Sequence, residues 1–407
     1  MTAARDRTSP APAPGPGPGT SPDTGGGTTG VPSPAEPSAR AGAAARAYRP
    51  ALRGGVLLSP PLLRGPRTVH LVRNPVSGAA FEVGTKEHFV ISRLDGTRNF
   101  DDIGPEYAAR FGRRLTVENW HRLLGLLGAR GLLDGAPDPP PAPPAPPRTG
   151  TLWRGTRRMV ADADATTARL HRLLRPLLHP AVQLPLLAAE AAMVVVLAVH
   201  AGELLGGAAE LVRQPAVLVA VALLLWLSIT LHELGHGVAA QHYGGSVAEI
   251  GLRWRFPVAI MYCTVDNYLF LPGRRAKLVI AGAGAHVNLL LLLPFAVWWA
   301  LAPEDGTERP LLAGLLLLGG VQALSNIVPI PPLDGYRMLG HALGAAQLAP
   351  ETRAYLTLRR REGRAAATTA YPRRARVLYT AYGAVWAALV CLAVGGTCAA
   401  AAVLVLG

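Results

Sequence analysis

Cysteine is almost absent from this chain of 407 residues, which has only 3, scattered as Cys263, Cys391 and Cys398. An odd number of distant cysteines does not form a disulfide framework, and the spacing does not match a zinc ribbon. We therefore interpret all three as small buried hydrophobic residues.

Charged residues are also scarce, at 16%, whereas 50% of the residues are hydrophobic. The net charge of +14 is high enough to suit a nucleic-acid partner. However, the arginines lie mainly between long apolar runs, which is the pattern that membrane topology produces. The composition thus favours a membrane protein and gives no support for nucleic-acid binding.

The apolar runs predict a polytopic α-helical membrane protein with about five or six spans. Each run is long enough to cross a bilayer. The last run is too long for one untilted span, and Gly395-Gly396 is a candidate break within it, so the number of spans after Arg376 stays open. The predicted spans cover residues 181–201, 215–238, 278–301, 311–330 and 377–405.

The loops alternate in charge and so predict an orientation. Arginines are concentrated before the first predicted span, between the second and third, and after the fourth. The two connections on the other side are short and acidic, with Glu203 and Glu210 in the first and Glu304, Asp305 and Glu308 in the second. The positive-inside rule then places the N-terminus and the arginine-rich loops in the cytoplasm. We expect the spans to lie in a bacterial cytoplasmic membrane.

A metal-binding pattern, His232-Glu233-Leu-Gly-His236, ends the apolar run 215–231. On a helix, histidines four residues apart share one face and can bind one zinc ion, while Glu233 beside them can take a proton from a zinc-bound water. Ionisable residues in a membrane span are costly and usually functional. Two protein ligands are one fewer than a catalytic zinc usually has, so a third is expected elsewhere.

A second motif supplies that candidate ligand. The fourth predicted span ends in Asn326-Ile-Val-Pro-Ile-Pro-Pro-Leu-Asp334-Gly, in which prolines stop the helix and a carboxylate follows. The charge-based topology puts His232, His236 and Asp334 at the cytoplasmic ends of their spans, and hence at similar depth. By itself, Asp-Gly after prolines is most often only a turn.

Together the two motifs resemble those of the site-2 protease family of intramembrane zinc metalloproteases. That family has HExxH on one span and NxxPxPxLDG on another, and every fixed position of the second is matched here. The resemblance implies that His232, His236 and Asp334 bind Zn²⁺ and that Glu233 is the general base.

The segment Ala283-Gly-Ala-His286-Val-Asn288 resembles a third family segment, AGPxxN, with Ala285 where proline is common. Asn288 is a candidate for orienting substrate or stabilising an oxyanion, and an interhelical hydrogen bond is an equal alternative. Asn326 is a second candidate for substrate binding. We interpret His286 as a packing residue, because a fourth protein ligand would close the site to water.

Four parts make up the predicted domain organisation. Residues 1–46 are a disordered Pro/Gly-rich tail, 47–135 a small folded domain, 136–152 a Pro-rich linker, and 153–407 the transmembrane zinc metalloprotease domain. Within the second part, Thr68–Val72 and Ala80–Val83 predict a hairpin. Helical patterns follow at 86–94, 100–111 and 117–129, and Thr116 is expected to cap the last of them.

A hairpin with three helices predicts an α+β winged-helix-like domain. Its Asn74-Pro-Val-Ser-Gly-x-x-Phe turn resembles PqqD-like domains, which recognise leader segments of ribosomally made peptides. The resemblance implies that a leader peptide adds a strand to the hairpin edge, and a purely regulatory or packing role is the alternative. The helix 117–129 has too few basic residues for DNA.

The sequence thus predicts hydrolysis of a peptide bond, in a peptide or membrane-protein substrate, at the cytoplasmic side of the membrane. The expected role is leader removal during maturation of a ribosomally synthesised peptide. Site-2 cleavage of a membrane-anchored regulator such as an anti-sigma factor is the alternative. An alternative function of another class is that of a non-catalytic membrane scaffold or a peptide-export component.

Overall fold

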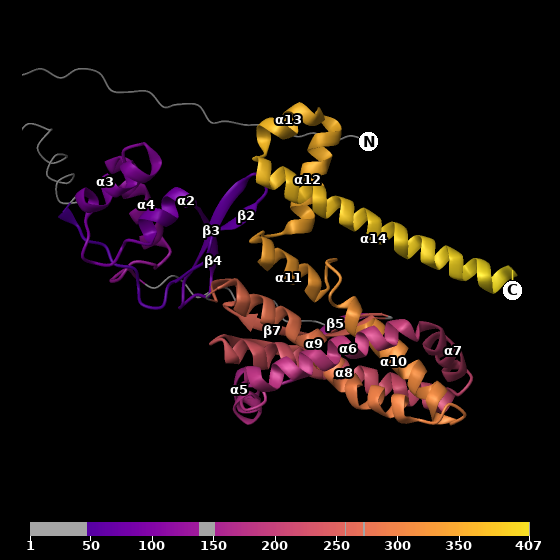
Figure 1. The fold of residues 1–407 in the computed structure, drawn as a ribbon. Helices are drawn as coiled ribbons and strands as arrows, with labels where there is room; N and C mark the ends of the chain where they lie inside the picture. Colours follow the sequence, from indigo (N-terminus) through magenta and orange to yellow (C-terminus); the bar gives the residue numbers. More distant parts are fainter. Residues whose placement is uncertain (1–46, 138–150, 257, 272, 407) are drawn as a thin grey trace, which may run out of the picture.

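The computed structural model describes residues 47–137, 151–256, 258–271 and 273–406. The predicted tail, residues 1–46, and residues 138–150 of the predicted linker lie outside the described residues. The described part has an N-terminal α+β portion, a helical bundle with a small sheet, and C-terminal helices (Figure 1).

The N-terminal portion contains a four-stranded antiparallel sheet with β3 (Arg67–Arg73) at its centre. β1 (Leu57–Leu58) and β2 (Leu62–Arg64) pair with β3 along one edge, and β4 (Ala80–Gly84) pairs along the other. This confirms the predicted hairpin. The two short strands β1 and β2 were not predicted, because two or three residues carry no readable alternation.

Three helices complete the N-terminal portion: α2 (Thr85–Ile91), α3 (Phe100–Phe111) and α4 (Val117–Ala129). The predicted bounds of the last two are confirmed, and the Thr116 hydroxyl accepts a hydrogen bond from the Asn119 N–H, as expected of a cap. Trp120 and Ile103 lie at the centre of the core between helices and sheet. The winged-helix class and the PqqD-like assignment stay predictions.

Four helices are long and apolar enough to cross a membrane, as judged by length and composition: α6 (Pro180–Val199), α8 (Pro215–His242), α9 (Arg274–Leu301) and Arg373–Gly396 of α14 (Arg373–Leu406). They fit a membrane protein. The predicted fourth span corresponds to α10 (Glu308–Ser325), which is not among the four. Glu308 and Arg309 occupy its first turn and lower its mean hydropathy, so the number of spans stays a prediction.

The first acidic connection is a helix, α7 (Ala201–Val212), which packs against α10. Glu203 of α7 pairs with Arg309 in the first turn of α10, directly after the second acidic connection, at 2.7 Å. Both acidic connections therefore meet at one end of the bundle. This contact agrees with the alternation of loop charge that oriented the helices. Leu292, Ala313 and Leu316 form the core between α9 and α10.

A three-stranded antiparallel sheet lies against the other end of the bundle, in the order β5 (Arg154–Arg158), β6 (Ser246–Arg255) and β7 (Val258–Asp266). The hairpin of β6 and β7 occupies the connection between α8 and α9. α5 (Ala163–Leu174) packs on both α8 and β6. The sheet therefore covers the end of α8 that carries the metal-binding pattern.

The C-terminal part has α11 (Asp334–Leu343), α12 (Leu348–Arg361), α13 (Gly363–Ala370) and α14. α14 runs unbroken through Gly395-Gly396, so the candidate break at these glycines is wrong. Cys391 and Cys398 are exposed on α14, which packs mainly on α12 and α13 near its start, so the expected burial holds only for Cys263.

The N-terminal portion touches the C-terminal helices through β2. The Leu63 N–H donates to the Gly344 carbonyl at 2.8 Å, and the Ala346 N–H donates to the Leu63 carbonyl at 2.8 Å. Tyr379 of α14 donates to the Gly65 carbonyl at 3.1 Å. These contacts join segments that lie about 280 to 314 residues apart in the chain (Figure 1).

Candidate metal centre

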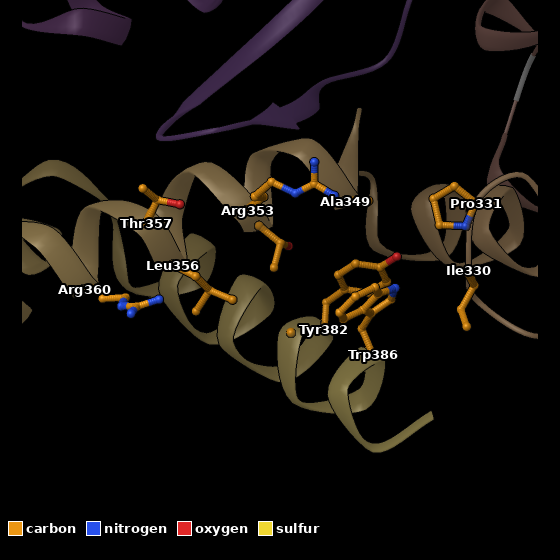
Figure 2. Close-up of a pocket in the computed structure, with 11 residues that line it drawn as sticks. Ile330, Pro331, Ala349, Arg353, Leu356, Thr357, Arg360, Tyr382 and Trp386 are labelled. Carbon is orange, nitrogen blue, oxygen red and sulfur yellow. The ribbon is translucent and has the colours of Figure 1, made fainter. Parts of the chain in front are cut away.

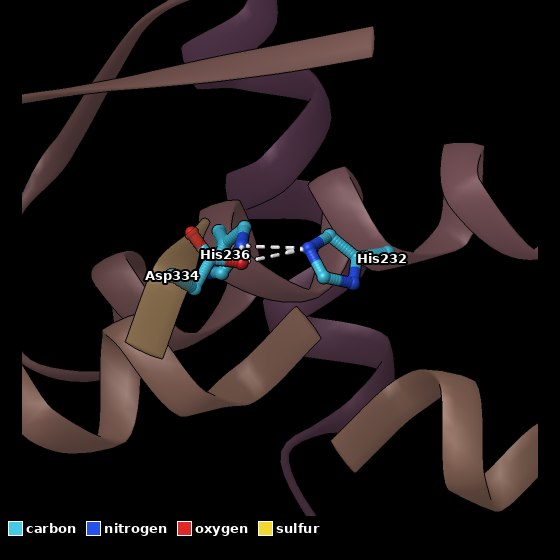
Figure 3. Close-up of side chains that lie close together, drawn as sticks. All are labelled: His232, His236 and Asp334. Carbon is cyan, nitrogen blue, oxygen red and sulfur yellow. Dashed lines mark hydrogen bonds and ion pairs between the residues drawn. The ribbon is translucent and has the colours of Figure 1, made fainter. Parts of the chain in front are cut away.

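Three side chains from two helices meet at one point (Figure 3). His232 and His236 lie on α8, and Asp334 is the first residue of α11. The Oδ2 atom of Asp334 is 2.9 Å from Nε2 of His232 and 3.1 Å from Nε2 of His236. The two Nε2 atoms are 3.2 Å apart. All three residues are buried.

Asp334 reaches the histidines because the chain folds back after α10. That helix ends at Ser325, and the Gly335 N–H donates to the Asn326 carbonyl at 2.7 Å. A Cβ at position 335 would overlap the carbonyl oxygen of Ile327, so the fold-back requires glycine there. The Asp-Gly pair that closes the second motif thus has a defined geometric role.

The residues present fit a zinc ion. Two imidazoles and one carboxylate are a donor set that zinc accepts, and three protein ligands leave a position for water or substrate. Burial opposes ionisation of Asp334, but contacts from His232 and His236 hold the pKa of its carboxyl below the usual value, so it offers an anionic oxygen. Each histidine also has a partner for its second nitrogen, as metal-bound histidines need.

Those partners are the Ile280 carbonyl, 2.7 Å from Nδ1 of His236, and the Asn288 amide, whose Nδ2 is 3.1 Å from Nδ1 of His232. The Ser228 hydroxyl lies 2.9 Å from Oδ1 of Asn288. A neutral imidazole that binds metal through Nε2 carries its proton on Nδ1. Asn288 must then offer its oxygen to His232 and its nitrogen to Ser228, which is the same amide rotated by half a turn.

Glu233 faces the small sheet. Its carboxylate accepts a hydrogen bond from the backbone N–H of Cys263 on β7. A cavity of about 230 Å³ lies here, lined by His236, by Cys263, Thr264 and Val265 of β7, by Tyr268, and by Arg337 of α11. His236, one of the three candidate ligands, therefore borders this space, with β7 as its wall.

Among the described residues, β7 has a strand partner on one edge only, because the sheet order is β5-β6-β7. An edge strand offers unpaired N–H and C=O groups to an extended peptide. The cavity beside the metal ligands thus has a wall suited to holding peptide backbone.

The sequence patterns did not predict Arg337 as a residue of the site. Its Nη1 lies 3.7 Å from Oδ1 of Asp334, and it lines the cavity. The signal was available: Arg337 follows Asp334 by three residues on a helix, so the two share a face.

Two further groups near the cavity, the His341 imidazole and the Tyr268 phenol, stay uncharged. Burial, with Lys277 and Arg337 nearby, lowers the pKa of His341 to about 4, and His341 packs edge-on against Tyr268 at 4.8 Å between ring centroids. Burial raises the pKa of the Tyr268 phenol, which donates to the Lys277 carbonyl at 2.6 Å.

The remaining sequence candidates are placed as follows. Asn288 contacts His232, as described above. The side chain of Asn326, the residue that follows α10, donates to the Gln322 carbonyl at 3.1 Å, outside the ligand cluster. His286 pairs with buried Glu190 at 2.9 Å, in agreement with a packing role. Asp266, the last residue of β7, pairs with Arg73 of β3 at 2.6 Å. A substrate-binding role for Asn288 or Asn326 stays a prediction.

Comparison with known proteins finds two partial similarities. The chain is 26% identical over 113 residues to a Bacillus subtilis protein named "Putative peptide zinc metalloprotease protein YydH", covering 28% of this chain and 43% of that protein. It is 32% identical over 117 residues to "Zinc metalloprotease MJ0392" of Methanocaldococcus jannaschii, covering 29% of this chain and 32% of that protein. No family model matches the chain, and no solved structure is significantly similar to it.

The matched regions thus span less than half of either relative. Their names support a zinc metalloprotease family for this chain. The donor set of His232, His236 and Asp334 agrees with that class.

Proposed function

We propose that this protein is an intramembrane zinc metalloprotease of the site-2 type, which cleaves a peptide bond at the cytoplasmic side of a bacterial membrane. One observation carries the proposal: two histidines of a helix apolar enough to span a membrane meet the carboxylate of Asp334, with Glu233 beside them. The names of the two relatives support the same class.

The residues divide the chemistry between them. Zinc held by His232, His236 and Asp334 would polarise the substrate carbonyl and make water acidic. Glu233 is placed to take the proton of the attacking water and to return it to the leaving amine. The Cys263 N–H that contacts Glu233 fixes the direction of its carboxylate. Arg337 adds positive charge next to the cavity.

The substrate must be extended at the cleavage site, because a helical carbonyl is hydrogen-bonded within its own helix. The free edge of β7 supports this step. It lines the cavity that also contains His236, so a peptide paired with β7 would pass beside the metal ligands. Backbone pairing would bind the peptide largely independently of the identity of its side chains.

For the biological role, we infer leader removal from a ribosomally synthesised peptide. The resemblance of residues 47–135 to PqqD-like domains supports this inference. So does the ion pair of Arg73 with Asp266, which connects β3 to the residue that ends β7. A leader held by the N-terminal portion would be delivered close to the β7 edge.

The decisive experiment uses the full chain in lipid nanodiscs, wild type and Glu233→Gln. Zinc per chain is measured by mass spectrometry, and cleavage is measured on labelled unfolded casein and on any short precursor peptide encoded beside the gene. We expect one zinc per chain in both proteins and a cleavage rate at least ~10²-fold lower for Glu233→Gln. Absence of zinc, or equal cleavage by the wild type and Glu233→Gln, would refute the proposed protease activity. A precursor that fails to bind at micromolar concentration would remove only the maturation role.

A further inference from the structure

A second cavity, of about 490 Å³, lies between α12 and α14 (Figure 2). Arg353, Leu356 and Arg360 of α12 line one side, and Tyr382 and Trp386 of α14 line the other. Ile330 and Pro331 close one end. The metal ligands do not line this cavity, so it is a separate site.

The cavity is positive at its α12 side. Arg353 and Arg360 are seven residues apart, which puts both on one face of the helix. Both are exposed, and neither forms an ion pair with any residue that the structure describes. Two unpaired guanidinium groups beside one cavity suit a phosphate group, which they can bind by charge-assisted hydrogen bonds.

The rest of the cavity is apolar and partly open. Leu356 is 37% exposed and Trp386 is 44% exposed, although both lie in the region where α12 packs on α14. A soluble anion would gain nothing from this surface. A ligand with a hydrocarbon part would cover it and gain free energy in proportion to the apolar area.

The position relative to the membrane points to the source of such a ligand. α14 has 34 residues, or about 51 Å of helix, whereas the hydrocarbon core of a bilayer is about 30 Å thick. The first turns of α14, which pack against the arginine-rich α12, therefore fit the interface region. Tyrosine and tryptophan gather at that level, and basic pockets there bind anionic lipid head groups.

A buried hydroxyl supplies an independent observation. Thr352, which lines the cavity, is only 4% exposed, and its Oγ1 has no hydrogen-bond partner among the described residues. A buried hydroxyl without a partner costs about 1–3 kcal/mol, so a polar group of a bound ligand would relieve a real deficit.

We propose that this cavity binds an anionic phospholipid of the arginine-rich side of the membrane. Arg353 and Arg360 hold the phosphate, Thr352 contacts a head-group oxygen, and Leu356 and Trp386 contact the acyl chain. The lipid also contacts the segment before Asp334, because Pro331 lines the cavity and Tyr382 donates to the Pro329 carbonyl at 3.1 Å.

The test measures binding of fluorescent phosphatidylglycerol to the full chain in detergent, by anisotropy, with unlabelled lipids as competitors. Phosphatidylglycerol should compete at least tenfold better than phosphatidylcholine. Arg353→Gln with Arg360→Gln should weaken binding at least tenfold. Arg359→Gln with Arg361→Gln, which removes the same charge from exposed positions outside the cavity, should change it less than twofold. Arg353→Lys with Arg360→Lys should keep most of the binding and shows that the helix tolerates substitution.

Three outcomes would overturn the proposal. Equal competition by phosphatidylcholine would mean that the cavity is not selective for anionic lipid. An equal loss in the Arg359/Arg361 variant would assign the effect to overall charge. Displacement by inorganic phosphate alone would identify a site for a soluble anion. Glu233→Gln should bind the lipid normally, so this result does not depend on proteolysis.

Discussion

Gly284 of α9 lies directly against the imidazole of His232, and a Cβ at position 284 would overlap the ring. The helices α8 and α9 approach this closely because the residue between them has no side chain. The position of His232, and with it the geometry of the metal centre, therefore depends on a glycine that binds nothing itself.

Gly284→Ala should consequently displace His232 and lower zinc affinity at least tenfold, with a matching loss of cleavage. Gly282→Ala is the matched control, because a Cβ at 282 would meet only Met338 at an ordinary 3.5 Å. Zinc titration with a chromophoric chelator measures both variants. If Gly284→Ala bound zinc as tightly as Gly282→Ala does, His232 would not be a ligand in this geometry.

The sequence predicted that His232, His236 and Asp334 come together, because its signals are local. HExxH is a spacing within one helix, and NxxPxPxLDG is a helix stop followed by a carboxylate. α3 and α4 were also predicted to the residue, since Thr116 and the apolar periodicity mark their limits. Such patterns depend on neighbours in the chain, so they can be read without the fold.

What the sequence could not predict involves partners far apart in the chain. β2 pairs with residues 344–346 through backbone atoms, which leave no trace in side-chain pattern. Asn288 was a candidate for substrate, and only the packing of α9 on α8 shows its amide against His232. The cavity between α12 and α14 forms only when these two helices lie side by side, which no motif encodes.

The amide of Asn288 should set the affinity of the metal centre. Asn288→Leu keeps the size but removes the partner of His232 Nδ1, so we expect a loss of about 10–100-fold in zinc affinity. Asn288→Asp keeps an acceptor for Nδ1–H and should bind zinc within a few-fold of wild type. Competition titration with a chelator measures both. Equal zinc affinity in the Leu and Asp variants would contradict a positioning role for Asn288.

The ion pair of Arg73 with Asp266 should help to hold the N-terminal portion in place. Their side chains are 20% and 36% exposed, so the pair contributes at most about 1 kcal/mol. Arg73→Asp and Asp266→Arg should each speed amide exchange at Leu63 and Ala346, where β2 pairs with the C-terminal part. The double variant should restore slow exchange.

Arg122→Asp is the control for this charge reversal, because among the residues that the structure describes Arg122 forms an ion pair along α4 alone, with Glu118. It should leave exchange at Leu63 unchanged. Slow exchange in both single variants would show that the Arg73–Asp266 pair does not hold the N-terminal portion in place.

The stability of the N-terminal portion should fall in mild acid, because it holds a histidine in its neutral form. Burial, His70 and Arg93 lower the pKa of His88 from 6.5 to about 4, and its ring stacks on that of His70 at 3.7 Å between centroids. Because the folded pKa is depressed, the unfolded chain takes up the proton first, and the stability present above pH 6.5 is lost as the pH falls toward 4. The full shift would correspond to about 3 kcal/mol, and the half-exposed ring reduces this to about 1 kcal/mol.

Amide exchange of α2 and β3 in the full chain, at pH 7 and pH 5, measures the loss. His88→Gln should remove most of the pH dependence, whereas His121→Gln, on the exposed face of α4, should keep it. An unchanged pH dependence in His88→Gln would show that another group governs the acid response.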